Sequence, residues 1–230
     1  MNLQSKETIK AISFVVSRVQ KREFLFHRSY CRLDSHTSDE HLMTQKIVNG
    51  LNVQEVQALI EAVKKEPGIA QARFHTSTNW ITGFQNQASI KDFTLGGVTN
   101  STSRTKPFTV VGDHPQELLG TNKGPSSVEL LLAALGHCIG SGFSTYGAHM
   151  GIPIVSLVVE IQGDVDLQGM LALPEPGKVR PGFQKIMAKY YVQSEAPREQ
   201  LQQLGKLAED LSPTRDSLRA VPFSSELVVK

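Results

Sequence analysis

One cysteine in a long apolar segment is the side chain of this sequence best suited to chemistry. Cys138 lies near the middle of residues 123–150, KGPSSVELLLAALGHCIGSGFSTYGAHM. Its thiolate could attack an electrophile or carry redox chemistry. The alternative is that Cys138 only fills space in a core, as free cysteines in apolar helices usually do. The function of the chain depends on which of these holds.

The histidines near Cys138 in the sequence are weaker candidates. His137 adjoins it, but consecutive residues of a helix point about 100° apart, so we expect His137 to pack rather than to act as a base. His149 lies three turns further on, too far to act within one subunit. His114 precedes the segment in a loop and could approach the site, although most loop histidines are solvated.

No other pattern in the chain supports catalysis or a bound group. We find no spacing of histidines, cysteines or carboxylates typical of a metal site. A phosphate-binding loop and a serine nucleophile elbow are also absent from the sequence. We therefore expect no cofactor and no metal.

The segment that carries Cys138 has the pattern of one long helix. Ser126 and Glu129 form a capping box after Pro125. One face is formed at helical spacing by Leu131, Leu135, Cys138 and Gly142. Glycines in a helix interior each cost about 1 kcal/mol relative to alanine. The segment has four, which favours close approach of a second long helix: Gly136, Gly140, Gly142 and Gly147. Although it is as long as a membrane span, its glycines, histidines and serines indicate a core helix.

The rest of the pattern predicts an α+β fold. We expect further helices at residues 52–65 and 197–211, and a short turn or helix at 213–218. Alternation predicts strands at 70–80, 87–95, 108–111, 154–166, 183–193 and 223–229. Loops are expected at 96–106 and 173–182. This order favours α+β over a doubly wound parallel sheet.

Composition limits the class of protein. A chain of 230 residues with 40% hydrophobic content can bury a sizeable core. The net charge of +2 gives no support for a nucleic acid or a membrane as a partner. Two cysteines, Cys31 and Cys138, form no disulfide framework, and no N-terminal segment resembles a secretory signal. We therefore expect a cytoplasmic location, where thiols stay reduced.

The first part of the chain differs from the rest. We expect residues 1–45 to be an N-terminal extension and residues 46–230 to form the core domain. The extension mixes short apolar patches with charges, and a cleaner pattern opens at Met43. It is either a flexible or docking appendage, or a leader upstream of a natural start at Met43. Cys31 lies in it and is treated as an incidental thiol.

Several motifs, in their order and spacing, resemble the OsmC/Ohr family. G-P-S-S-x-E-L-L-L-A-A-L-x-x-C is similar to the family's helix with the peroxide-reactive cysteine. DHPQELLGTNKGP before it, RPGF between two later strands and LSPTRDSL after a later helix are also similar. The likeness covers residues 73–230. It implies the OsmC-like fold, an intertwined homodimer with two long central helices inside a wrap of antiparallel strands and active sites at the subunit interface.

The resemblance also implies a chemistry. Members of the family reduce organic hydroperoxides: a cysteine becomes a sulfenic acid, and a second cysteine resolves it as a disulfide. Cys138 matches the first cysteine, and Glu129 matches a glutamate that holds the thiolate and orients the substrate. Ser212 stands where the second cysteine is expected, which excludes the two-cysteine cycle unless Cys31 is recruited. The family's arginine has no match, because residues 82–87 contain none. Two other arginines, Arg73 and Arg104, lie outside a matching motif.

Three hypotheses therefore remain for Cys138. The chain is a stress-response protein that reduces small organic hydroperoxides with an external thiol, such as glutathione or a dihydrolipoyl protein. Alternatively, it is a non-catalytic dimer that binds a small apolar or reactive molecule, or Cys138 is only a core residue. Arg215 and Asp216 are expected to form a local ion pair rather than to serve the site.

Overall fold

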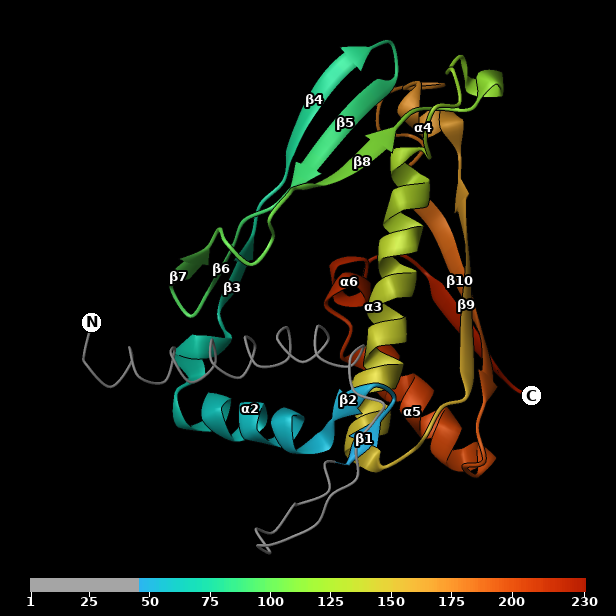
Figure 1. Cartoon of the computed structure of the whole chain (residues 1–230). Coiled ribbons are helices and arrows are strands. Elements are labelled where there is room, and N and C mark those ends of the chain that lie inside the picture. The colour runs from blue at the N-terminus through green and yellow to red at the C-terminus, as the bar shows by residue number, and fades with distance from the viewer. Residues whose placement is uncertain (1–45) are drawn as a thin grey trace, which may run out of the picture. The chain divides into compact units, whose positions relative to one another are not determined.

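The fold is described from a computed structural model, for residues 46–230 of the chain. These residues form two compact units (Figure 1). The larger unit comprises residues 47–53, 76–90 and 107–230, and the smaller one includes residues 54–75 and 91–106. The predicted extension, residues 1–45, and Cys31 within it lie outside the described residues.

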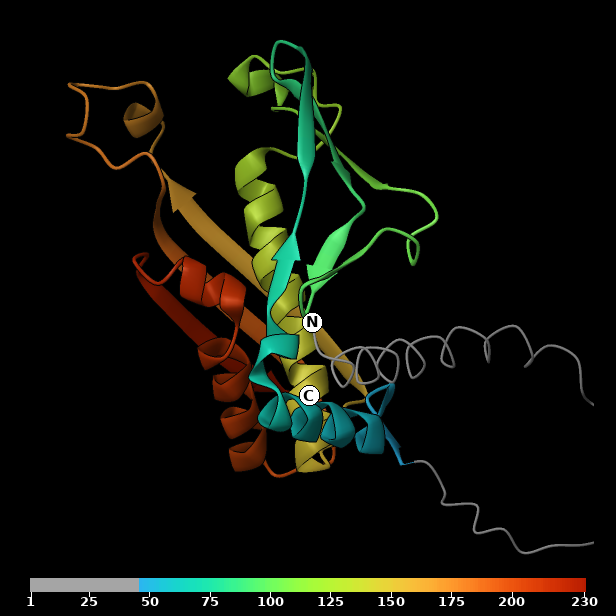
Figure 2. The ribbon, with the colours of Figure 1, turned by 90° about the vertical axis from the view of Figure 1, so that its left-hand side faces the viewer.

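The larger unit is built on a three-stranded sheet with a long helix packed against it. Its strands are β9 (Ser156–Val165), β10 (Phe183–Gln193) and β11 (Phe223–Val229). β10 is central, antiparallel to β9 and parallel to β11. The helices are α3 (Ser127–Met150), α5 (Arg198–Asp210) and α6 (Pro213–Ser217). α3 contacts α5, α6 and β9, as Figures 1 and 2 show. The α+β prediction is confirmed.

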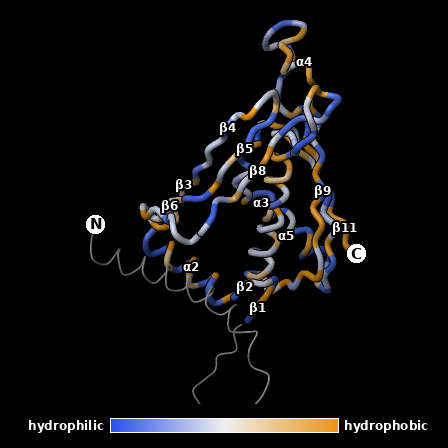
Figure 3. Tube along the Cα trace, turned by 45° about the horizontal axis from the view of Figure 1, so that its top comes forward, coloured by the Kyte–Doolittle hydropathy of each residue, from blue (hydrophilic) through white to orange (hydrophobic). Residues whose placement is uncertain are grey.

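Alternating side chains of β10 are buried and form one side of the hydrophobic core. Ile186, Ala188, Tyr190 and Val192 are buried, whereas the residues between them face outward. They pack against buried residues of the helices: Leu135, Ile139 and Phe143 of α3, and Leu201 and Leu204 of α5. The rings of Phe143 and Tyr190 meet edge to face, with centroids 5.5 Å apart. Figure 3 shows apolar stretches, in orange, along β9 and β11.

The long helix begins and ends as its sequence requires. Ser126 is the N-cap, and Glu129 completes the predicted capping box. Gly151 ends the helix in the left-handed region, with φ 71°, where glycine is favoured. Among residues 46–230, α3 is the one helix long and apolar enough to cross a membrane, a test that core helices also pass. In this fold its buried face packs on α5 and β9.

The helix glycines have different neighbours. A Cβ on Gly142 would lie 3.0 Å from the Cα of Ala208, so here the backbone of α5 makes the close approach. A Cβ on Gly136 would make ordinary contact with Ile161, and one on Gly140 would meet nothing within 4 Å. The expected close approach is therefore found at Gly142, and it comes from α5 of the same chain.

A short hairpin that the sequence analysis missed holds the C-terminal end of α3. β1 (Ile47–Val48) and β2 (Leu51–Asn52) are joined by Asn49 and Gly50, with φ 52° and 76°. Positive φ at both positions is typical of the type I′ turn that Asn-Gly favours. Asn49 donates from Nδ2 to the carbonyl of Ile152 at 3.0 Å and accepts at Oδ1 from the amide of Ile154 at 2.8 Å. The turn thereby fixes the exit from α3.

A second sheet of the larger unit comprises β4 (Ser77–Thr82), β5 (Gln85–Ile90) and β8 (Phe108–Gly112), antiparallel and in that order. It carries large apolar side chains that are exposed in the single chain: Trp80, Ile81, Phe84, Phe108 and Val111. The connection from β9 to β10 contains α4 (Leu167–Met170), which precedes the loop predicted at 173–182.

The smaller unit corrects the extent of two predicted strands. It holds almost all of α2 (Val53–Lys65), the short helix η1 (Pro67–Ala70), and the strands β3 (Ala72–Phe74), β6 (Phe93–Leu95) and β7 (Val98–Asn100). The strand predicted at 70–80 is β3 plus β4, and the one at 87–95 is β5 plus β6. Each pair divides because β3 and β6 pair together in one sheet and β4 and β5 pair in another. β7 forms in the predicted loop at 96–106.

Candidate functional site

Cys138 faces the first turn of α6. The Ser212 hydroxyl donates a hydrogen bond to Cys138 Sγ, with an Oγ–Sγ distance of 3.0 Å. Ser212 is also the N-cap of α6, since its Oγ accepts from the amide of Arg215 at 3.1 Å. Pro213 follows at the first helical position, where its missing N–H costs nothing. The Ser212 side chain is therefore fixed between two partners, and only 3% of the residue is exposed.

The surroundings of Cys138 favour its ionised form. Burial raises the pKa of the thiol, but hydrogen bonds from the Ser212 hydroxyl and from the Thr214 amide and hydroxyl lower it, and the net direction is down. Hydrogen bonds to a charged group favour the charged state. The thiolate is the reactive form of cysteine. A lowered thiol pKa makes nucleophilic chemistry at Cys138 easier.

Ser212 occupies the place that the sequence analysis assigned to a second cysteine. Its side chain lies beside Cys138, 74 positions away in the sequence. A hydroxyl forms no disulfide, and Cys138 is the one cysteine among residues 46–230. Within the described part of the chain, an oxidised Cys138 therefore has no thiol with which to form an internal disulfide.

Glu129 lies on the other side of α3. Its carboxylate accepts from the amide and the hydroxyl of Ser126, both at 2.7 Å. These two bonds lower the pKa of Glu129. Nine residues separate Glu129 from Cys138, which is about 180° around the helix and about 14 Å along it. The predicted pair of site residues is therefore not brought together within one chain.

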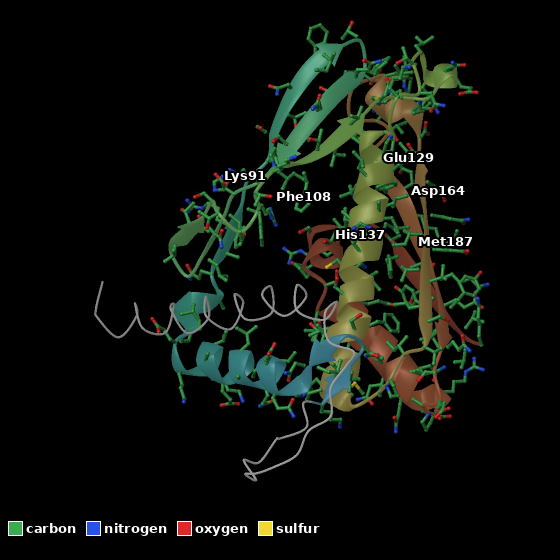
Figure 4. The ribbon with its side chains drawn as sticks, viewed as in Figure 1. Lys91, Phe108, Glu129, His137, Asp164 and Met187 are labelled. Carbon is green, nitrogen blue, oxygen red and sulfur yellow. The ribbon has the colours of Figure 1, made fainter. Side chains whose placement is uncertain are left out.

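The face with Glu129 borders a groove between α3 and β9. The groove has a volume of about 530 Å³ and is lined by Glu129, Leu132, Ala133, Gly136, His137, Val159 and Ile161. Figure 4 labels Glu129 at the start of α3 and His137 further along it. Since His137 lines this groove, it points away from Cys138, as predicted, but it is exposed rather than packed within the chain. Cys138 does not line the groove.

His114 belongs to a different cavity. Its ring stacks on Phe84, with centroids 4.3 Å apart and the planes 11° from parallel. Both residues line a cavity of about 320 Å³ at the start of α3, together with Asp113 and Ser127. Cys138 does not line this cavity either. His149, near the end of α3, is exposed.

Two of the arginines considered from the sequence, Arg215 and Arg104, have other partners. Arg215 stacks its guanidinium on the ring of Phe223 at 4.4 Å. Asp216 pairs with Arg219 at 3.7 Å, so the ion pair expected between Arg215 and Asp216 is replaced by one at helical spacing. In the smaller unit, Arg104 donates to the carbonyl of Lys91 at 2.9 Å and lies over the Phe93 ring.

Two residues that the sequence analysis did not select shape this region. Thr214 supplies two of the hydrogen bonds that lower the pKa of Cys138. Asp113, 2% exposed, accepts from the amides of His114, Thr121 and Lys123 and from the Thr121 hydroxyl, and so orders the loop before α3. The loop motif DHPQELLGTNKGP contained Asp113, but its partners come from backbone that only the fold brings together. Across residues 46–230, no group of three or more metal-ligating side chains converges.

Comparisons with known proteins agree with the motifs. The family model described as OsmC-like protein matches residues 120–226. The structure of an OsmC-like protein from Mycoplasma pneumoniae is 14% identical and superposes with a TM-score of 0.53, covering 68% of this chain and 96% of that one. For an OsmC-like protein of unknown function from Vibrio cholerae the identity is 11%, the TM-score 0.51, and the coverage 68% and 99%.

A third structure has the same fold. It is a protein from Psychrobacter arcticus that carries a provisional name, osmotic stress induced and detoxification response protein. It is 12% identical, with a TM-score of 0.50, and covers 70% of this chain and 98% of that one. No curated protein matches the sequence. Residues 120–226 therefore match the OsmC-like family model, and the chain has the fold of OsmC-like proteins.

Proposed function

We propose that this OsmC-like protein serves in the stress response by reducing small organic hydroperoxides at Cys138, with an external thiol as the reductant. One observation carries the proposal: the buried Ser212 hydroxyl donates to Cys138 Sγ at 3.0 Å. Together with Thr214, this contact lowers the pKa of the thiol. The provisional name of the Psychrobacter arcticus protein, which includes a detoxification response, supports the same class of function.

The reaction requires one thiol from the protein and two from the solution. The Cys138 thiolate attacks the terminal oxygen of the hydroperoxide, the O–O bond breaks, and the alcohol leaves with a proton. Cys138 is then a sulfenic acid. One external thiol condenses with it to form a mixed disulfide and water. A second external thiol releases Cys138 as a thiol and leaves as a disulfide with the first, so that electrons and atoms balance.

We also propose a homodimer in which α3 packs on α3 of a second copy. The face of α3 along the groove carries small residues at helical spacing, Ala133, Gly136, Gly140 and Ser144. Large apolar side chains such as Trp80 and Phe108 are more than half exposed in the single chain, as expected for surfaces that a partner covers. Since Glu129 points away from Cys138 of its own chain, it serves a thiol only across such an interface.

A second candidate function is non-catalytic binding of a small apolar molecule. The groove of about 530 Å³ between α3 and β9 favours it, because the groove is lined mainly by apolar side chains and excludes Cys138. In this case Cys138→Ala leaves both ligand binding and dimer stability intact.

The proposed function is tested with purified full-length protein, cumene hydroperoxide and dithiothreitol. Hydroperoxide consumption is expected in the wild type and in a Cys31→Ser variant, and is expected to disappear in Cys138→Ser. Activity that survives Cys138→Ser removes the peroxidase proposal. Saturable binding of an apolar probe with no turnover in any variant favours the second candidate.

A further inference from the structure

The geometry points to Ser212 as a positioning residue that holds the Cys138 thiolate through a directed hydrogen bond and leaves its oxidised form to an outside thiol. This inference rests on the proposed function for its catalytic meaning. The hydrogen bond itself rests only on the contact between α3 and α6. The hydrogen bond and the proposed function can therefore be tested by separate experiments.

The direction of the hydrogen bond follows from what the Ser212 hydroxyl can donate and accept. A serine hydroxyl has one hydrogen to donate and lone pairs that accept. One lone pair of Ser212 is occupied by the amide of Arg215 at 3.1 Å, the N-cap bond of α6. Cys138 Sγ, at 3.0 Å, is the acceptor for the hydrogen. The cap thus orients the hydroxyl, and a thiolate, which can only accept, is its best partner.

Thr214 completes the set of donors. Its amide and its hydroxyl help the Ser212 hydroxyl to lower the pKa of the Cys138 thiol. Ser212 differs from Thr214 in being held from two sides and in being almost wholly buried. It is therefore the donor least able to turn away. Removal of the Ser212 hydroxyl takes one hydrogen-bond donor from Cys138 Sγ and leaves the burial of the sulfur unchanged.

The same contact determines how an oxidised Cys138 is recycled. Closing a disulfide requires a thiol that condenses with the sulfenic acid and releases water. The hydroxyl of Ser212 lies against Cys138 Sγ but has no sulfur to offer. Since residues 46–230 hold no other thiol, we expect the attack to come from an external thiol, which leaves a mixed disulfide at Cys138. A thiol introduced at Ser212 would instead close an internal disulfide.

The first test measures the rate of iodoacetamide alkylation at Cys138 against pH in full-length protein carrying Cys31→Ser. Ser212→Ala and Ser212→Gly both remove the donor, but glycine is the better N-cap of the two. We expect both to move the alkylation profile to higher pH and to slow alkylation at neutral pH several-fold. Ser212→Thr, which retains a hydroxyl, should restore the wild-type profile.

Ser217→Ala is the matched control, because that hydroxyl lies on the same short helix and donates to the Pro213 carbonyl instead. It should leave the profile unchanged. Equal profiles for the wild type, Ser212→Ala and Ser212→Gly would overturn the positioning role. If the alkylation profile shifts in Ser212→Ala but not in Ser212→Gly, the cause is loss of the N-cap of α6 rather than loss of the hydrogen-bond donor to Cys138.

The second test is Ser212→Cys in the same background. After one equivalent of cumene hydroperoxide, this variant should lose two thiols and show an internal disulfide by mass. Under the same treatment with glutathione, the protein with Ser212 should form the mixed disulfide at Cys138. A mixed disulfide in both proteins would overturn the inference about recycling. An altered alkylation profile without any hydroperoxide turnover would remove the proposed function and leave the positioning role standing.

Discussion

Glu129 and Cys138 project from opposite sides of α3. The Glu129 carboxylate is bound by Ser126 at the start of the helix, and Cys138 is bound by Ser212 from α6. The two residues are nine positions apart, which is two and a half helical turns, and their side chains therefore lie on opposite sides of the helix. The carboxylate and the thiol can therefore act on one substrate only if each is contributed by a different copy of the chain.

Mixed dimers test this relationship. Glu129→Gln should keep the capping box, because glutamine also reaches back to the cap, and should lose hydroperoxide turnover. Cys138→Ser loses turnover as well. When the two inactive variants are mixed and allowed to exchange subunits, turnover should return, because one site of each mixed dimer then has both residues. Mixtures that remain inactive would contradict catalysis across the interface.

The structural role of Glu129 is measured separately. Glu129→Ala removes the two hydrogen bonds to Ser126 and should lower the free energy of unfolding by about 1 kcal/mol, whereas Glu129→Gln should lose much less. Urea denaturation of both variants gives the comparison. Equal losses in the two variants would mean that the charge, rather than the cap geometry, stabilises the helix.

Two glycines of α3 distinguish packing within the chain from packing between chains. A Cβ on Gly142 would press on Ala208 of α5 at 3.0 Å, so Gly142→Ala should destabilise the subunit itself. A Cβ on Gly140 meets nothing within 4 Å in the single chain. Gly140→Ala should weaken self-association in sedimentation equilibrium if α3 packs on a second copy. A Gly140→Ala variant that is more stable by about 1 kcal/mol, with unchanged association, would contradict that packing.

Asn49 is expected to be important for stability. Asn49→Gly keeps the left-handed turn and removes the side-chain bonds to Ile152 and Ile154, so its cost isolates those bonds. We expect a loss of about 1–3 kcal/mol in urea denaturation. Asn49→Ala should cost more, because alanine also strains the turn at φ 52°. Equal stability of Asn49→Gly and the wild type would show that the Asn49 side-chain hydrogen bonds contribute nothing to the free energy of unfolding.

Asp113 predicts a pH dependence of stability. Hydrogen bonds from the Thr121 hydroxyl and from three amides lower its pKa to about 2, against the opposing effect of burial. A carboxyl whose folded pKa lies below its unfolded value, about 3.9, stabilises the fold above that value. The contribution is then lost as pH falls toward about 2. Asp113→Asn should lower Tm at neutral pH and remove this part of the acid dependence. An unchanged acid profile in the variant would contradict this role.

The sequence predicted the elements whose signals are local. Ser126 and Glu129 form the predicted capping box, and the strands at 183–193 and 223–229 have the predicted bounds. The division of 70–80 into two strands was not predictable from alternation, because alternation does not identify the pairing partner. The hairpin at Asn49 carried a readable signal, Asn-Gly between apolar residues, and was missed.

The site was predictable only in part. Cys138 was identified from its helix, and Ser212 from its position in LSPTRDSL. The hydrogen bond between their side chains depends on how α6 meets α3, and no sequence period encodes that. The distance between Glu129 and Cys138 in the sequence did imply opposite faces, through helical geometry alone.

The most direct test is single-turnover oxidation of the Cys31→Ser protein by one equivalent of cumene hydroperoxide, without a reductant. Each chain should consume one hydroperoxide and form one sulfenic acid, trapped by dimedone and mapped to Cys138 by mass spectrometry. The Cys138→Ser chain should consume none. Hydroperoxide that remains unconsumed by folded protein, or dimedone that fails to label Cys138, would contradict the account.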